Sequence, residues 1–157
     1  MKKNIRVVLL GELVLLVLVF LLCLGNGAIS SITWFVDLPS MILIALVFIP
    51  GLLIMGEWKD FLKSFSVGIR RYSLLELKNI IGAVTAAQKL TLLGALFSII
   101  TPGILVVGHL DDFTTIGPNL AVCFLSALYA VIVEFFLLPL RLNAERKMNE
   151  EMDFGDE

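Results

Sequence analysis

The sequence predicts an all-α integral membrane protein with four transmembrane helices, and two observations support this fold class. First, 59% of its 157 residues are hydrophobic and only 17% are charged, which is too apolar for a soluble domain. Second, four apolar stretches occupy residues 7–28, 39–56, 90–108 and 116–140. Each is close to the roughly 20 residues that a helix needs to cross a bilayer. Because lipid cannot satisfy backbone N–H and C=O groups, stretches that cross it must be helical.

The basic residues predict how the chain is oriented. All 12 Lys and Arg residues precede the first stretch, lie between the second and third, or follow the fourth. The connections around 30–37 and 109–119 contain none. Under the positive-inside rule, both termini and the middle loop are then cytoplasmic. We expect a single membrane domain over residues 1–157.

The first stretch has a second interpretation, a cleaved signal peptide. A basic start, an apolar run and the small residues "GNGA" at 25–28 fit that pattern. Glu12 within the run favours a retained helix instead. Cys23 and Cys123 both lie inside expected spans, where cysteine commonly acts as a small apolar residue.

The cytoplasmic connection, residues 57–89, contains its own helical pattern. Trp58, Phe61, Phe65 and Ile69 recur at helical spacing, which predicts that the second span continues into the cytoplasm as an amphipathic helix and ends near 70–72. The alternative is a solvated, charged connector.

The residues Ser73-Leu74-Leu75-Glu76 fit a capping box at the start of another helix. No turn signal follows before the third span, so one long helix is expected to enter the membrane from the cytoplasm. Pro118 is expected near the first turn of the fourth span. The tail, residues 141–157, ends acidic and suggests a frayed helix end.

No motif for covalent catalysis is present. The sequence lacks a glycine-rich phosphate loop, an HExxH motif and cysteines paired at metal spacing. His109 is the single histidine, with no second histidine or nearby cysteine, so neither a metal site nor a cofactor is expected. We therefore expect no enzyme activity.

A few polar residues inside the expected spans are the candidates for function. Ser98, Thr101 and Glu134 lie within the third and fourth spans, and Glu12 lies at a comparable depth in the first. Such residues are costly in lipid and usually face protein or water. The glutamates have the alternative of reaching back to the cytosolic interface, and the hydroxyls that of bonding the carbonyl one turn back. Pro102 is expected to kink or open the third span.

Two segments resemble a known family. "FVDLPSMILI" (35–44) is similar to the stretch that opens the second span of flagellar stator subunits of the MotA type, in the MotA/TolQ/ExbB proton-channel family. "LDDFTTIGPNLAVCFLSALYAVIVEFFLLPL" (110–140) resembles their outer loop and fourth span. The matching residues are Asp111, Asp112, Gly117, Pro118, Ala121, Val122, Leu128, Tyr129 and Pro139.

The resemblance implies a homopentamer around a dimer of a single-span MotB/ExbD-like protein, in the bacterial cytoplasmic (inner) membrane. In that family the partner carries the ion-binding aspartate, and the third and fourth spans line the pore. It also implies that residues 37–40 form a structural entrance that need not bind an ion. The residues expected to face the pore or ion pathway are Ser98, Thr101, Ser126, Ala127 and Glu134. Those expected to act as structural or hinge positions are Pro102, Pro118 and Pro139.

The chain also departs from the family pattern. The family's threonine in the fourth span falls on Ala127, and a connection of 57–89 is too short for the family's rotor-contacting region. Three hypotheses follow. The chain is a pore-forming stator-like subunit coupling H⁺ or Na⁺ flow to movement of a partner, a non-conducting scaffold of the same fold, or an unrelated four-span transporter that uses Glu12 and Glu134.

Overall fold

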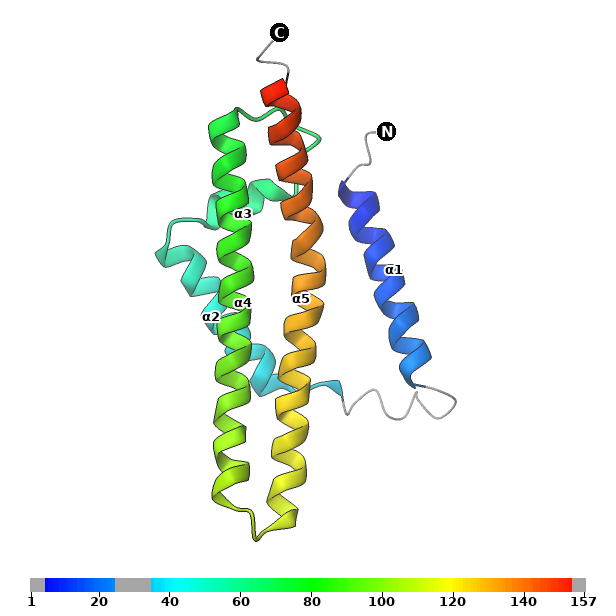
Figure 1. Cartoon of the computed structure of the whole chain (residues 1–157), viewed down its shortest axis with the longest axis vertical. Helices are drawn as coiled ribbons and strands as arrows, with labels where there is room; N and C mark the ends of the chain where they lie inside the picture. The colour runs from blue at the N-terminus through cyan, green and yellow to red at the C-terminus, as the bar shows by residue number, and fades with distance from the viewer. Residues whose placement is uncertain (1–4, 25–34, 154–157) are drawn as a thin grey trace.

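The structure is a computed structural model that describes residues 5–24 and 35–153. Within these ranges the regular secondary structure is entirely helical (Figure 1). The helices are α1 (Ile5–Leu24), α2 (Leu38–Ile54), α3 (Trp58–Ser64), α4 (Leu74–Gly108) and α5 (Phe113–Asp153).

Helices α4 and α5 form a long antiparallel hairpin, and each is long and apolar enough to cross a membrane. Helix α2 meets the same criteria only when joined to α3 across a bend of 109°. The apolar part of α1, Val7–Leu21, is shorter. The structure therefore describes a membrane protein with two clear membrane-length helices and up to three if the bent pair counts as one span. Four spans, and their orientation, stay a prediction.

The predicted long helix before the third span is confirmed. The Glu76 backbone N–H donates to Ser73 Oγ over 3.3 Å, and the Ser73 N–H donates to Glu76 Oε2 over 3.0 Å. These reciprocal bonds satisfy free donors at the helix start. From this cap α4 runs for 35 residues, continuing past Pro102.

The prediction that one helix continues from the second span through the amphipathic segment is wrong. Helix α2 ends at Ile54, and the chain turns through Gly56, whose φ of +75° suits glycine far better than other residues. The amphipathic segment is the separate, short helix α3, which ends at Ser64 rather than near 70–72. Phe61 and Ser64 are buried against the rest of the chain, so this connection is not the solvated connector of the alternative interpretation.

Helix α5 is longer at both ends than the sequence predicted. It begins at Phe113, where the Asp112 carboxylate accepts a 3.0 Å hydrogen bond from the Thr114 N–H. Pro118 consequently lies in the second turn rather than the first. At the other end α5 continues to Asp153, so most of the expected frayed tail is helix.

Small residues let α2 approach the hairpin. A Cβ added at Gly94 of α4 would lie 3.0 Å from Ile44 Cα in α2, so the two backbones are close at this point. Nearer the end with the charged residues, a core cluster joins α1, α2, α3 and the hairpin; it contains Ile5, Leu52, Phe61, Ala83, Val84, Ala87, Leu137 and Leu140.

The helices do not all reach the same level. Ser40, in the first turn of α2, is hydrogen-bonded to Ser126, and Ser126 lies 13 positions after the start of α5 at Phe113. At 1.5 Å per residue, the hairpin therefore extends about 20 Å beyond the start of α2. Figure 1 shows this extension below α2.

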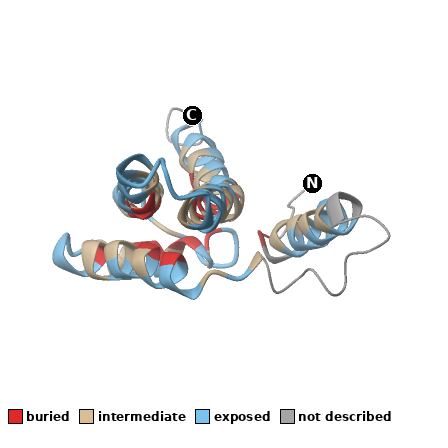
Figure 2. Cartoon of the chain, turned by 90° about the horizontal axis from the view of Figure 1, so that it is seen from below, coloured by how far each residue is buried: buried red, intermediate tan, exposed pale blue. Residues whose placement is uncertain are grey.

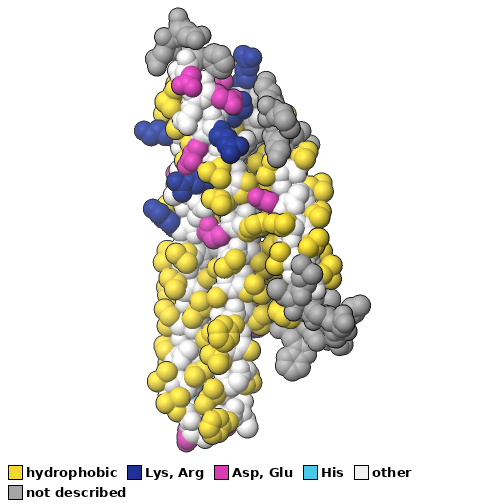
Figure 3. Space-filling model, turned by 45° about the vertical axis from the view of Figure 1, so that its right-hand side comes forward, with side chains coloured by type: hydrophobic (Ala, Val, Ile, Leu, Met, Phe, Trp, Pro, Cys, Tyr) yellow, Lys and Arg dark blue, Asp and Glu magenta, His cyan; other side chains and the backbone are white. Residues whose placement is uncertain are grey.

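Figure 2 shows, among the described residues, α2 along one side of the hairpin and α1 beyond α5, with no helix covering the opposite side of the hairpin. Figure 3 shows that Lys, Arg and most acidic side chains gather toward the end where the chain finishes, while hydrophobic side chains cover the rest. This separation fits a protein with one end exposed to water and a long apolar body.

Candidate functional site

Three buried serines meet where α2, α4 and α5 pack together. Ser126 Oγ of α5 lies 2.9 Å from Ser98 Oγ of α4 and 3.0 Å from Ser40 Oγ of α2. It is also 2.8 Å from the Val122 carbonyl oxygen in its own helix. We call Ser40, Ser98 and Ser126 the serine cluster. Their exposed fractions are 2%, 4% and 0%, so the cluster is closed off by the chain itself.

Asp37 extends the serine cluster at the start of α2. Its carboxylate accepts a 3.2 Å hydrogen bond from the Ser40 N–H and a further bond from the Ser40 hydroxyl. This is the geometry of a helix N-cap, in which an acidic side chain satisfies a free N–H group of the first turn. Asp37 therefore caps the start of α2, and the entrance role expected for residues 37–40 stays a prediction.

Tyr129 fixes the same point from α5. Its hydroxyl accepts a hydrogen bond from the Asp37 N–H over 2.6 Å and donates to the Phe35 carbonyl oxygen over 2.7 Å. Two of the residues that carry the family resemblance, Asp37 and Tyr129, are therefore direct partners. Together with the serine cluster they tie α2 to the hairpin through polar contacts in an apolar region, where unpaired groups are costly.

The remaining hydroxyl and alanine candidates lie apart from this cluster. Thr101 is exposed, and its hydroxyl donates to the Phe97 carbonyl oxygen over 3.0 Å, as the alternative interpretation expected. Ala127 is half-buried. The structure brings Ser98 and Ser126 together but places Thr101 on the outside of the chain.

The prolines differ in their surroundings. Pro102 and Pro139 are buried, whereas Pro118 is exposed. Helices α4 and α5 continue through all of them, so none ends a helix. Their expected hinge role stays a prediction.

Glu134 has a partner that the sequence did not suggest. Its Oε2 accepts a 2.9 Å hydrogen bond from the Gln88 amide of α4, rather than bonding Arg141 or Lys89. Arg141 instead pairs with Glu145 over 2.8 Å. The alignment of the two hairpin helices could have identified Gln88. In two antiparallel helices, the residue numbers of facing residues add up to a nearly constant value. Ser98 and Ser126 give nearly the same value as Gln88 and Glu134.

Glu12 is the least satisfied of the candidates. Its Oε2 is buried and has no hydrogen-bond partner among the described residues. Within those residues no hydrogen bond joins Glu12 to Glu134, whose carboxylate is held by Gln88. The structure therefore gives the two glutamates different surroundings rather than one shared polar site.

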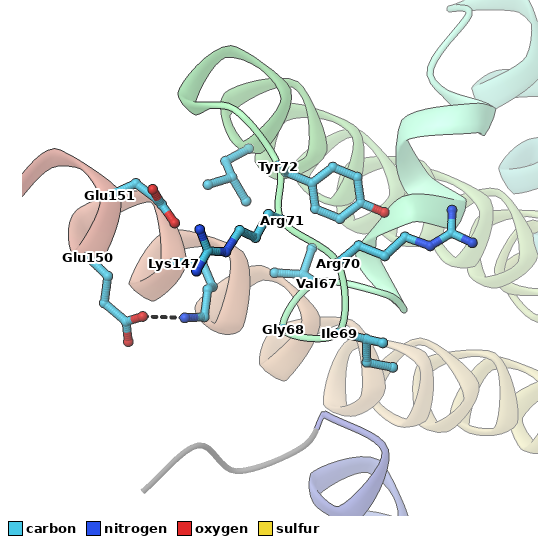
Figure 4. A pocket seen from close by; sticks show the side chains of 10 residues that line it. Val67, Gly68, Ile69, Arg70, Arg71, Tyr72, Lys147, Glu150 and Glu151 are labelled. Carbon is cyan, nitrogen blue, oxygen red and sulfur yellow. Dashed lines mark hydrogen bonds and ion pairs between the residues drawn. The ribbon is translucent and has the colours of Figure 1, made fainter. Parts of the chain in front are cut away.

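A cavity of about 700 Å³ lies at the charged end, between the loop 67–72 and the end of α5 (Figure 4). Arg71, Lys147, Glu150 and Glu151 line it, and Lys147 is paired with Glu150. Basic and acidic side chains thus both line this cavity.

Comparison of the chain with family models, with curated proteins and with solved structures found no match. The function is therefore inferred from the geometry of the described residues and from the resemblance carried by 35–44 and 110–140.

Proposed function

We propose that this protein is a pore-forming subunit of a stator-like complex that couples H⁺ or Na⁺ flow to movement of a partner protein. It acts as a homo-oligomer, a pentamer by the family resemblance, around a dimer of a single-span MotB/ExbD-like protein. The complex resides in the bacterial inner membrane. This chain supplies the wall of the pore, and the partner supplies the titrating carboxylate.

The observation that carries the proposal is the uncovered side of the α4–α5 hairpin. The hairpin is longer than the described parts of α1 and α2, and among the described residues no helix lies against one of its sides (Figure 2). Large apolar side chains are exposed on its outer half, among them Phe97, Ile100, Ile104, Leu120 and Phe124. Hairpins of this form can stand side by side around a central helix, which would cover those side chains.

The serine cluster then has a positioning role. Ser98 and Ser126 face α2 within the chain, so they hold the hairpin at a fixed angle to α2. Thr101 lies on the exposed surface of α4, and we assign to it the hydroxyl that meets the ion. Ala127 and Glu134 are both half-buried, and Glu134 is paired with Gln88 of α4.

A non-conducting scaffold is the second candidate, and one observation favours it. Ser40, Ser98 and Ser126 satisfy one another inside the chain, and Glu134 is paired with Gln88. A non-conducting scaffold needs only such internal pairing, whereas a pore-forming subunit must also offer polar groups to the ion.

The two candidates differ in a measurable flux. The full chain is co-expressed with any single-span protein that a neighbouring gene encodes, and the complex is purified in mild detergent. Its mass is measured by native mass spectrometry, and it is then reconstituted in liposomes. We expect an oligomer with a bound partner and a proton or sodium flux that Thr101→Val lowers several-fold. Thr85→Val is the matched control, because Thr85 also donates to a carbonyl one turn back in α4.

Each result discriminates. Flux that falls in Thr101→Val but not in Thr85→Val supports the pore-forming subunit. A stable oligomer without flux supports the scaffold, and a monomer without a partner contradicts both.

A further inference from the structure

Helix α3 runs across the long axis of the molecule rather than along it. The chain bends by 109° between α2 and α3, and Figure 1 shows α3 lying crosswise behind the hairpin. Phe61 of α3 belongs to the same core cluster as Leu140, the last residue before Arg141. α3 therefore lies at the level where the apolar run of α5 meets its first basic residue.

The side chains of α3 are sorted around its axis at about 100° per residue. Phe61 and Ser64 point into the chain and are buried. Phe65, just past the helix, lines an apolar cavity with Leu13 and Leu137, so it faces the apolar body. Leu62 is 50% exposed and lies on the side away from the chain.

Basic residues accompany this apolar edge. Lys59 lies about 60° from Leu62 around the helix and is exposed. Arg70 and Arg71 follow in the next loop and are also exposed. Figure 4 shows the Arg70 side chain extending away from Arg71 and Lys147. Within the described residues, none of Lys59, Arg70 and Arg71 is in an ion pair.

Lys63 differs from these residues in one respect. Its ammonium group pairs with Asp60 over 2.7 Å, and this hydrogen bond raises the pKa of Lys63 above its ordinary value. Its charge is thus already balanced within α3.

We propose that residues 58–71, which we call the interface platform, lie at the cytoplasmic membrane–water interface and bind the phosphate of anionic phospholipid headgroups. Lys59 and Arg70 donate to the phosphate, while Leu62 and Phe65 contact the acyl chains. Short amphipathic segments with basic polar faces bind anionic membranes in this way, and the long stems of Lys and Arg reach the headgroups from an apolar edge. The inference needs the chain to be a membrane protein and does not depend on ion conduction.

Charge complementarity is the reason to choose lipid. The platform combines exposed apolar side chains with three basic residues that form no ion pair among the described residues, Lys59, Arg70 and Arg71, at the level where the apolar body ends. Arg70 and Arg71 also line the cavity at the end of α5, where Lys147 is paired with Glu150.

The test measures lipid binding to the full chain in mild detergent by native mass spectrometry. The probes are dioleoyl phosphatidylglycerol, dioleoyl phosphatidylcholine and inorganic phosphate. We expect phosphatidylglycerol to bind more tightly than phosphatidylcholine, and each of Lys59→Gln and Arg70→Gln to lower its affinity about fivefold, the typical effect of one basic side chain near an anionic surface. Lys63→Gln is the matched control and should keep the preference.

The outcomes separate the sources of the phosphate. Equal binding of the two lipids overturns the proposal, as does an equal loss in Lys63→Gln. Competition by millimolar inorganic phosphate would point to a free-anion site instead of a lipid site and would also overturn it.

A second measurement reports the position of α3 directly. Trp34→Phe leaves Trp58 as the sole tryptophan of the two in the chain. Lipids brominated near the headgroup should quench Trp58 fluorescence more strongly in phosphatidylglycerol vesicles than lipids brominated near the chain ends. Absence of quenching by either lipid contradicts an interfacial α3.

Discussion

At the scale of single residues, Ser126 connects three helices. Its hydroxyl is within hydrogen-bond distance of Ser98 in α4 and of Ser40 in α2, and it is fully buried. A hydroxyl has one proton but accepts further bonds, so Ser126 can satisfy both neighbours at once. No other side chain in the described part of the chain joins α2, α4 and α5 through its own hydrogen bonds.

Ser126→Ala is therefore expected to destabilise the protein by about 1 kcal/mol, because the buried hydroxyls of Ser40 and Ser98 lose a hydrogen-bond partner. Interhelical hydrogen bonds in membranes contribute a free energy of about this size. The loss is measured as the free energy of unfolding in detergent–lipid mixtures. Thr101→Ala is the control: its hydroxyl is exposed and bonds only its own helix, so stability should change by less than half as much. Equal losses of unfolding free energy in the two variants would show that the serine cluster stabilises the protein no more than an exposed hydroxyl does.

Asp112 gives a pH-dependent prediction at the turn of the α4–α5 hairpin. Hydrogen bonds from the Thr114 hydroxyl, and then from Thr115, lower the pKa of Asp112 below its ordinary value. The stabilisation is thus present at neutral pH, above the ordinary aspartate pKa, and is lost as the pH falls through the lowered value.

Hydrogen exchange at the start of α5 measures this effect. Protection of the Thr114 amide, relative to Asp112→Asn, should decrease as the medium is acidified from pH 6 toward pH 3. The ratio to the variant removes the intrinsic pH dependence of exchange. A ratio that stays constant across this range would contradict the cap.

At the scale of helices, Gly94 decides how closely α2 and α4 approach. An added Cβ would lie 3.0 Å from Ile44 Cα and 3.3 Å from its carbonyl oxygen, which are backbone atoms that cannot rotate away. At Gly82, in the same helix, a Cβ would meet nothing within 4 Å. The same substitution therefore has opposite expected effects at the two positions.

Gly82→Ala should stabilise the protein by up to about 1 kcal/mol, the difference in helix propensity between these residues. Gly94→Ala should destabilise it by about 1–3 kcal/mol, because overpacking forces α2 to move. Thermal unfolding in one detergent compares the two variants. If both are equally stable, the close approach of α2 and α4 is absent.

The sequence predicted some elements well because their signals are local. Ser73 and Glu76 lie three positions apart and specify the start of α4 by themselves. The bend at Gly56 was missed because an apolar stripe such as Trp58, Phe61 and Phe65 fits a continued helix as well as a new one. The choice depends on the packing of Phe61 under α2 and α4, which no local pattern contains.

The candidate site shows the same division. Ser98, Ser126 and Glu134 could be selected because polar residues are rare in apolar stretches. Ser40 was seen only as part of a family-like motif, and Gln88 was not selected at all. Their contacts, Ser40 with Ser126 and Gln88 with Glu134, depend on how neighbouring helices are aligned along their axes, and spacing within one helix does not fix that alignment.

At the scale of the whole molecule, the hairpin is the element that must be placed correctly in the membrane. Its turn, residues 109–112, carries no Lys or Arg, whereas the opposite end of α4 carries Lys78 and Lys89. Moving basic residues across a bilayer is costly, and cytoplasmic loops are accordingly enriched in them. The turn should therefore lie outside and the start of α4 inside.

Cysteine labelling of intact cells tests this orientation, after Cys23 and Cys123 are replaced by alanine. Asp111→Cys should react with a membrane-impermeant maleimide added outside, and Lys78→Cys should react only after the cells are opened. Both side chains are exposed, so a failure to react reports the side of the membrane rather than burial. Labelling of Asp111→Cys only in opened cells would show that the hairpin has the opposite orientation. The interface platform would then no longer face the cytoplasm, and the uncovered side of α4 and α5 could not line a pore of the proposed orientation.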